Sequence, residues 1–153
     1  MAAVNEPGAG GRALGVDLGE RRIGLALSDP GGVIASPHSV LRRGRDRAGD
    51  HRAILAVARD EGVVAIVVGL PRSLSGGLGP AARAALAEID ELRASAGACM
   101  TVEACDERFT TVVAERALVE GGVRRQDRRA VVDKVAAAVM LQSWLDARRR
   151  AVP

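Results

Sequence analysis

Four carboxylates occupy positions that could form one catalytic centre. Asp17 lies within the apolar segment 13–18, Asp106 and Glu107 end the apolar segment 100–105, and Asp133 lies on the inner stripe of the last expected helix. An ionised carboxylate in apolar surroundings costs several kcal/mol unless a partner compensates it. Clusters of carboxylate oxygens suit Mg²⁺ or Mn²⁺ rather than zinc. If these acids converge, two such ions about 4 Å apart could hold a phosphodiester and activate water.

Each acid also has a structural interpretation. Asp17 can accept hydrogen bonds from neighbouring backbone amides, and Asp106 can form an exposed ion pair with Arg108. Asp133 can pair with an arginine of the segment 124–129. The sequence alone does not choose between Asp106 and Glu107 as the acid that reaches inward.

The elements that must position these acids follow from apolar periodicity. The stretch GVDLGERRIGLALSD, residues 15–29, predicts two antiparallel strands around a tight turn at Gly19, because apolar and small residues alternate along 23–28. The segment 33–41 predicts a third strand, which Pro37 assigns to a sheet edge. The continuous apolar run 63–68 predicts a parallel strand that is buried on both faces.

The helices complete an α/β order. Asp46 is expected to cap a helix that ends before Gly62, and Pro80 to begin a second helix. The further expected elements are a strand over 100–105, a helix around 112–118, a basic loop over 124–129 and a last helix from a cap at Asp127 to Arg148. The order β-β-β-α-β-α-β-α-α predicts a five-stranded mixed sheet with helices on both faces.

Composition predicts one globular domain. The 153 residues are 48% hydrophobic and 27% charged, and no apolar run approaches the roughly 20 residues that a membrane span needs. We expect a flexible tail over 1–11, a single domain over 12–148 and a short tail over 149–153. The first residues do not resemble a secretory signal, so we expect a cytoplasmic protein with no membrane contact.

The positive charge favours a nucleic-acid partner. The net charge is +3, and arginines cluster at 42–47, at 124–129, where Arg124, Arg125 and Arg128 are candidates for phosphate contacts, and at 148–150. Because Lys134 is the only lysine, the clusters could also reflect an arginine bias of the genome. The only aromatic residues are Phe109 and Trp144, which argues against stacking of single-stranded bases.

The remaining polar residues receive no catalytic role. His38 and His51 are expected to be exposed, and Ser73 and Ser75 to form turns, because no histidine base lies near them. Cys99 and Cys105 are expected on one strand, roughly 20 Å apart, which is too far for a disulfide within the chain. We expect buried free thiols, with a bridge between two subunits as the alternative.

Four stretches resemble a known family. The stretches GVDLGERRIGLALSD, VVGLP, DERFTT followed by AER, and VDKVAAAVMLQSWLD are similar to the signature stretches of the YqgF family, also called RuvX. The match extends from Arg12 to Asp146. The resemblance implies an RNase H-like fold and a metal-dependent nuclease with Asp17, Asp106 or Glu107, and Asp133 as its acids. It also implies phosphate contacts by residues of the same stretches: Arg21, Arg22, Arg108, Thr110 and Thr111. Ser73 and Ser75 depart from the family pattern, which puts the substrate contacts of their loop in doubt.

Several functions remain in competition. The resemblance implies trimming of the 5′ end of pre-16S rRNA or cleavage of four-way DNA junctions, and a junction resolvase needs a symmetric dimer to make paired cuts. An actin-like or sugar-kinase-like ATP-binding fold also carries an aspartate between glycines, but it needs two copies of the fold. A non-catalytic nucleic-acid-binding module is the third alternative, and it would tolerate the substitution Asp17→Asn.

Overall fold

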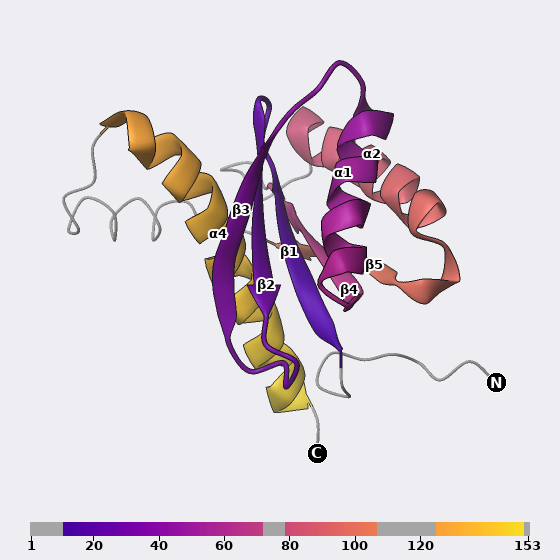
Figure 1. The fold of residues 1–153 in the computed structure, drawn as a ribbon, viewed down its shortest axis with the longest axis vertical. Coiled ribbons are helices and arrows are strands. Elements are labelled where there is room, and N and C mark those ends of the chain that lie inside the picture. Colours follow the sequence, from indigo (N-terminus) through magenta and orange to yellow (C-terminus); the bar gives the residue numbers. More distant parts are fainter. Residues whose placement is uncertain (1–10, 72–78, 107–124, 152–153) are drawn as a thin grey trace.

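The structure is a computed structural model that describes residues 11–71, 79–106 and 125–151. The elements, shown in Figure 1, are β1 (Arg12–Leu18), β2 (Arg22–Ser28), β3 (Ala35–Arg42), α1 (Arg47–Asp60), β4 (Val63–Leu70), α2 (Pro80–Ala96), a 3₁₀ turn (Gly97–Cys99), β5 (Thr101–Asp106) and α4 (Arg125–Ala151). This order agrees with the predicted one within the described ranges. The helix expected around 112–118 lies outside the described residues.

The five strands form one mixed sheet in the order β3-β2-β1-β4-β5. β1 pairs antiparallel with β2 and parallel with β4, while β3 pairs antiparallel with β2 and β5 pairs parallel with β4. β1 is therefore the central strand, and β3 lies at the edge that Pro37 predicted. The register between β2 and β3 shifts between Leu25 and Ala26, next to the pairing of Ala26 with Pro37.

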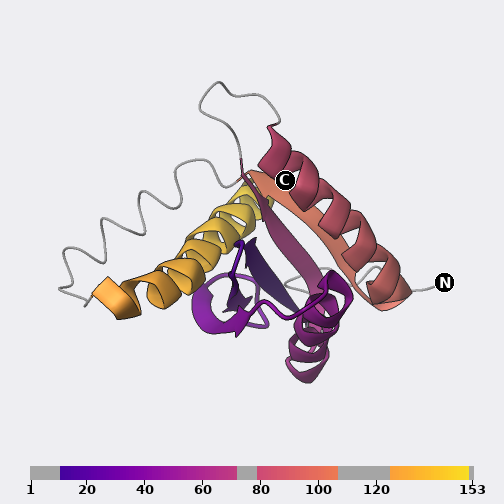
Figure 2. The same ribbon diagram turned by 90° about the horizontal axis from the view of Figure 1, so that it is seen from above.

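Helices cover both faces of the sheet, as predicted. Figure 2 shows α4 on one face and α1 and α2 on the other. The larger core, which includes Leu14, Val16 and Leu25, lies under α1 and α2. The smaller core lies under α4 and includes Ala13, Ala26 and several α4 residues. Strand alternation thus sends even-numbered residues of β1 toward α1 and α2, and odd-numbered residues toward α4.

Small residues of the sheet let α4 approach closely. A Cβ atom added at Gly24 would lie 2.0 Å from the backbone oxygen of Asp133, and one added at Gly15 would lie 2.9 Å from the Cβ of Leu141. The side-chain amide of Gln142 further fastens α4 to the β2–β3 hairpin through a 2.8 Å hydrogen bond from the backbone N–H of Ala35. These contacts fix the height of α4 above β1 and β2.

The ends of α1 and α2 agree with the predicted ones, whereas the start of α4 differs. Asp46 caps α1 by accepting a 2.7 Å hydrogen bond from the backbone N–H of Gly49, and Gly62 follows the helix with φ of 67°. α2 begins at Pro80, as expected. The expected cap at Asp127 and the expected basic loop are wrong in part, because α4 already includes residues 125–129. Arginine and glutamine favour helix strongly enough to extend it past a candidate cap.

In the described ranges, no helix combines the length and the apolar character that crossing a bilayer requires.

Candidate functional site

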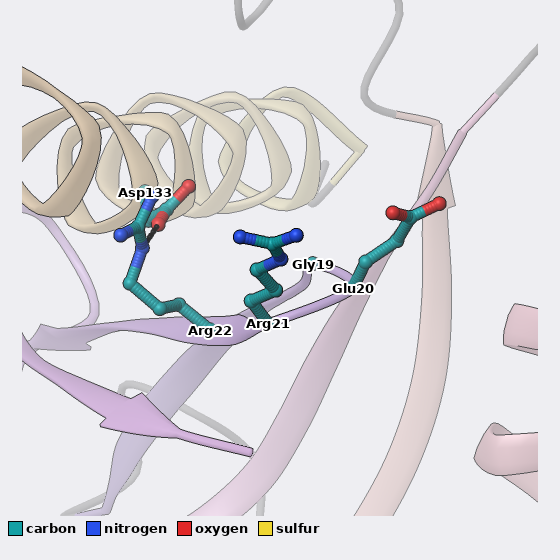
Figure 3. A pocket seen from close by; sticks show the side chains of 5 residues that line it. All are labelled: Gly19, Glu20, Arg21, Arg22 and Asp133. Atoms are coloured by element: carbon teal, nitrogen blue, oxygen red, sulfur yellow. Dashed lines mark hydrogen bonds and ion pairs between the residues drawn. The ribbon is translucent and has the colours of Figure 1, made fainter.

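A pocket of about 450 Å³ lies between the β1–β2 turn and α4. The described residues that line it are Gly19, Glu20, Arg21, Arg22 and Asp133. Figure 3 shows the Arg21 guanidinium between Glu20 and the Arg22–Asp133 pair. A 2.9 Å hydrogen bond from the backbone N–H of Gly19 to the backbone oxygen of Arg22 closes the turn. The pocket therefore places two arginines and an acid of a distant helix around one opening.

Asp133 is held over the sheet by an arginine of β2. The Nε of Arg22 donates a 2.9 Å hydrogen bond to Oδ2 of Asp133, and the two side chains are 34% and 23% exposed, respectively. Asp133 thus points toward the sheet, as its helical position predicted. Its described ion-pair partner comes from β2 rather than from the segment 124–129.

Asp17 lies beside Asp133 because of strand register. Asp17 pairs with Gly24 across β1 and β2. Directly opposite residues of an antiparallel pair lie on the same face, with Cβ positions about 4.5–5.5 Å apart. Since the Cβ direction of Gly24 meets the backbone of Asp133, the half-buried Asp17 side chain also lies on the α4 face. The fold therefore brings these two predicted acids together.

Asp106 lies on the other face of the sheet. It pairs with Leu70 of β4, and Leu70 packs against Ala82 and Ala85 of α2. Residues that are adjacent in a parallel pair share a face, so strand register directs Asp106 toward α2 and away from Asp17. Alternate residues of β5 face α4, as shown by the 3.2 Å hydrogen bond from Nε1 of Trp144 to Glu103.

The predicted trio of Asp17, Asp106 and Asp133 does not form one cluster. Among the residues that the structure describes, no three acid, histidine or cysteine side chains gather closely enough to hold a metal ion. Of the other predicted site residues, Arg21 is exposed at the pocket, and Arg125 and Arg128 belong to the first turns of α4. Glu107, Arg108, Thr110, Thr111 and Arg124 lie outside the described residues.

A buried ionic network behind the pocket was missed by sequence reasoning. The sequence places Arg43 only in a basic cluster, yet its guanidinium bonds Glu88 of α2 at 2.8 Å and Asp50 of α1 at 3.3 Å. His51 was expected to be exposed, and this is wrong: it is 3% exposed and lies 2.9 Å from Glu88. Asp50 and His51 fall on the apolar stripe of α1 with Ile54, a periodicity that could have revealed their burial.

The contacts within this network shift the pKa values of Arg43 and Glu88. The hydrogen bond with Glu88 raises the pKa of the Arg43 guanidinium above its ordinary value. Burial by itself would raise the pKa of Glu88, but hydrogen bonds from Arg43 and His51 outweigh burial and hold that pKa below its ordinary value. Both groups therefore stay charged at neutral pH.

Neither Cys99 nor Cys105 is part of a disulfide, which agrees with the predicted lack of a bridge within the chain. The reason given for it was partly wrong, because Cys99 lies in the 3₁₀ turn before β5 and not on the strand. Cys99 is exposed and Cys105 is half-buried, which corrects the expectation of buried thiols.

Comparison with known sequences identifies the family. The sequence model of RuvX, described as a Holliday junction resolvase, matches residues 11–147. The chain belongs to the RuvX family. A relative from Mycobacterium ulcerans is 47% identical over 146 residues, covering 94% of this chain and 84% of the relative. One from Mycolicibacterium paratuberculosis is 48% identical over 147 residues, covering 95% and 86%. Both are named as candidate pre-16S rRNA nucleases.

Solved structures confirm the RNase H-like fold. RuvC of T. thermophilus in complex with a Holliday junction substrate aligns with a TM-score of 0.52 at 19% identity, covering 91% of this chain and 96% of that one. A second structure, Thermus thermophilus RuvC, aligns with a TM-score of 0.54 at 18% identity and the same coverage. The predicted RuvX family, its nuclease class and the predicted fold class are thus confirmed.

Proposed function

We propose that this RuvX protein is a divalent-metal-dependent nuclease that hydrolyses phosphodiester bonds in structured nucleic acid. The observation that carries the proposal is the juxtaposition of Asp17 and Asp133 across Gly24, beside the pocket that holds Arg21 and Arg22. Two hard oxygen donors next to two guanidinium groups suit a cation and a phosphate together. The pocket thus supplies opposite charges for the two parts of a metal-bound phosphodiester.

The proposed metal ligands are Asp17, Asp133 and one acid that follows β5. When bound, Mg²⁺ or Mn²⁺ supplies an activated water and neutralises charge that develops on the phosphate. Strand register directs Asp106 toward α2, so we propose the neighbouring acid Glu107, which lies outside the described residues, as the third ligand. The matched substitutions Asp106→Asn and Glu107→Gln test this choice, and only the second is expected to abolish cleavage.

The arginines are proposed to hold the substrate. Arg21 is exposed at the pocket and can contact a phosphate directly. Arg22 neutralises Asp133, and it can also share its remaining donors with a phosphate, since a guanidinium carries five N–H groups. The further proposed phosphate contacts are Arg108, Thr110, Thr111, Arg124, Arg125 and Arg128.

The proposed substrate is the 5′ end of pre-16S rRNA. This proposal is supported by the names of relatives that are 43–48% identical to the chain. It would place the reaction in the cytoplasm, where the rRNA precursor of a bacterium is processed. The alternative is a four-way DNA junction cut by a homodimer, which the description of the family favours.

One experiment tests the proposed chemistry. Wild-type protein, Asp17→Asn and the control Asp60→Asn, whose acid is exposed at the end of α1, are incubated with a pre-rRNA leader and a four-way junction. We expect wild-type protein and Asp60→Asn to cleave in Mg²⁺ or Mn²⁺ and to stop when a chelator is added. Asp17→Asn should bind substrate at least as tightly as wild-type protein, because one negative charge that repels phosphate is gone. It should not cleave, because a proposed metal ligand is lost. Retained cleavage by purified Asp17→Asn would refute the proposal.

A further inference from the structure

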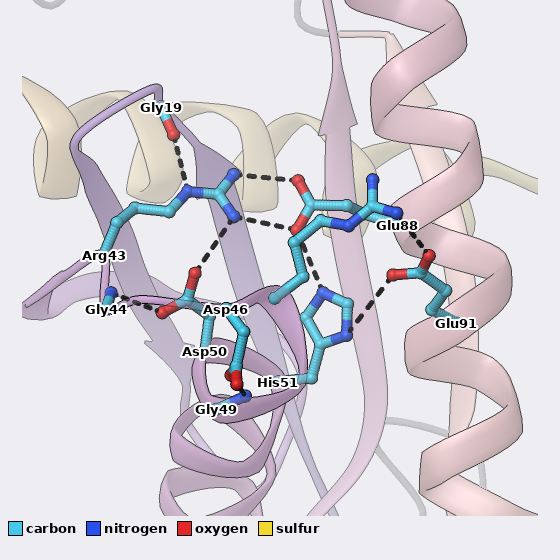
Figure 4. Close-up of polar contacts among 10 residues, drawn as sticks. Gly19, Arg43, Gly44, Asp46, Gly49, Asp50, His51, Glu88 and Glu91 are labelled. Carbon is cyan, nitrogen blue, oxygen red and sulfur yellow. Dashed lines mark hydrogen bonds and ion pairs between the residues drawn. The ribbon is translucent and has the colours of Figure 1, made fainter.

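The β1–β2 turn is clamped from the side opposite to α4 by one arginine. Figure 4 shows the Arg43 guanidinium between the Gly19 carbonyl, Asp50 and Glu88. Its Nε donates a 2.9 Å hydrogen bond to the backbone oxygen of Gly19. The backbone N–H of Arg43 donates a second bond of 2.9 Å to the backbone oxygen of Arg21. Two hydrogen bonds from one residue thus reach the segment that lines the pocket.

The guanidinium of Arg43 is itself held by carboxylates of α1 and α2. Two 2.8 Å hydrogen bonds join it to the two carboxylate oxygens of Glu88, and a third bond of 3.3 Å joins it to Asp50. The side chain of Arg43 is only 17% exposed, and those of Asp50 and Glu88 are 6% and 8% exposed. A bidentate pair with such low exposure has far less rotational freedom than a surface ion pair.

The held turn is the part of the chain that carries the site. Gly19 comes two residues after Asp17, and Arg21 and Arg22 follow two and three residues later. A shift of the Gly19 carbonyl would move the arginines relative to Asp133, since Arg22 bonds both Asp133 and, through its backbone oxygen, Gly19. The position of the turn therefore controls how the two sides of the pocket face each other.

We propose that Arg43 is a positioning residue of the candidate site, which fixes the β1–β2 turn against α1 and α2 through the Gly19 carbonyl. Its effect on cleavage rests on the function proposed above, whereas its effect on the turn does not. Only the planar guanidinium fork can serve Gly19, Asp50 and Glu88 together, because the compact ammonium of lysine cannot span these directions.

Arg43→Lys separates positioning from charge. It keeps a positive charge between Asp50 and Glu88, so the two buried acids are not left uncompensated, but it loses the bond to Gly19. The matched control is Arg93→Lys, because Arg93 of α2 also joins a carboxylate, Asp90, to a backbone carbonyl, that of Val102 at 2.8 Å, away from the turn. The control thus undergoes the same chemical change at another place.

Amide hydrogen exchange measured by NMR is the first readout. The Gly19 amide, which bonds the backbone oxygen of Arg22, should exchange about ten times faster in Arg43→Lys than in wild-type protein or Arg93→Lys. If Arg43→Lys does not fold, Glu88→Gln weakens the hold on the guanidinium without removing it, and it should give a smaller acceleration at the same amide. Unchanged exchange of Gly19 in the variant that folds would overturn the proposal.

Cleavage is the second readout. The kcat of Arg43→Lys should fall about 10- to 100-fold, while Arg93→Lys should stay close to wild type. If the wild-type protein does not cleave, the proposed function fails, yet the exchange rates still decide whether Arg43 holds the turn. If wild-type protein cleaves and Asp17→Asn does not, but Arg43→Lys matches wild type in kcat and in exchange, only the positioning role of Arg43 is overturned.

Discussion

The close approach of α4 to Gly24 makes Gly24→Ala the sharpest test of the site geometry. The added Cβ would lie 2.0 Å from the Asp133 backbone oxygen, whereas ordinary contact begins at 3.4 Å, so about 1.4 Å of separation is missing. The blocking atom belongs to helix backbone and cannot rotate away. Overpacking of this kind costs about 1–3 kcal/mol, and we expect a cost of about 2.5 kcal/mol. Alanine also lowers the conformational entropy of the unfolded chain, which stabilises the folded state by about 0.5 kcal/mol. The free energy of unfolding should therefore fall by about 2 kcal/mol in total.

Urea denaturation measures this loss. With a denaturant dependence of about 2 kcal/mol per M, the midpoint should fall by about 1 M. Gly15→Ala should lower it less, because the overlap is smaller: its Cβ would lie 2.9 Å from the Cβ of Leu141 and 3.0 Å from the backbone oxygen of Ala137. The control is Gly44→Ala, whose Cβ would lie 3.5 Å from Asp50 and should leave the midpoint unchanged or slightly raised. Trp144 of α4, the single tryptophan, is buried against the sheet and reports the transition by fluorescence.

The same substitution should impair the site. A displacement of α4 by more than 1 Å separates Asp133 from Asp17, and misplacement on this scale costs about 10- to 100-fold in rate. Cleavage by Gly24→Ala is therefore expected to drop under conditions in which the variant stays folded. If Gly24→Ala unfolds within about 0.2 M urea of Gly44→Ala and cleaves like wild type, the placement of Asp133 over β2 is wrong.

The remaining predictions concern two ion pairs. The folded-state pKa of Glu88 is below its ordinary value of 4.5, so its contribution to stability is present above that pH and disappears as pH falls through the folded-state pKa. Glu88→Gln should therefore destabilise the protein at pH 7, and urea midpoints should show this difference shrinking as the pH falls below 4.5. A difference that stays the same as the protein is acidified would contradict the prediction. Arg22→Gln should lower the free energy of unfolding by less than about 1 kcal/mol, since the pair with Asp133 is partly exposed, and a loss above about 2 kcal/mol would show that the pair supports the fold.

Local patterns predicted most of the fold. The alternation along 23–28 specified β2, the apolar run 63–68 specified a buried parallel strand, and Asp46 and Gly62 marked the ends of α1. These signals succeed because a strand or helix period and a cap are properties of consecutive residues. The family stretches then narrowed the fold to the RNase H-like class.

The burial of polar side chains is the main feature that the sequence did not predict. Glu88 and His51 lie 37 residues apart and bond each other at 2.9 Å. A histidine or glutamate on an apolar stripe is expected to avoid burial unless it finds a partner, and sequence does not show which partner will be present. Arg43 could not be separated from its basic neighbours for the same reason.

The sequence by itself determined which residues are chemically able to form a site: acids in apolar segments and arginines beside them. Tertiary structure decided which of these meet. Asp133 reaches Arg22 across 111 residues. Asp17 lies on the same face because of its register with Gly24, and the missing side chain at Gly24 lets α4 approach that face closely. Asp106 turns to the opposite face because its register with Leu70 fixes its direction, and register depends on pairing between strands that no local pattern contains.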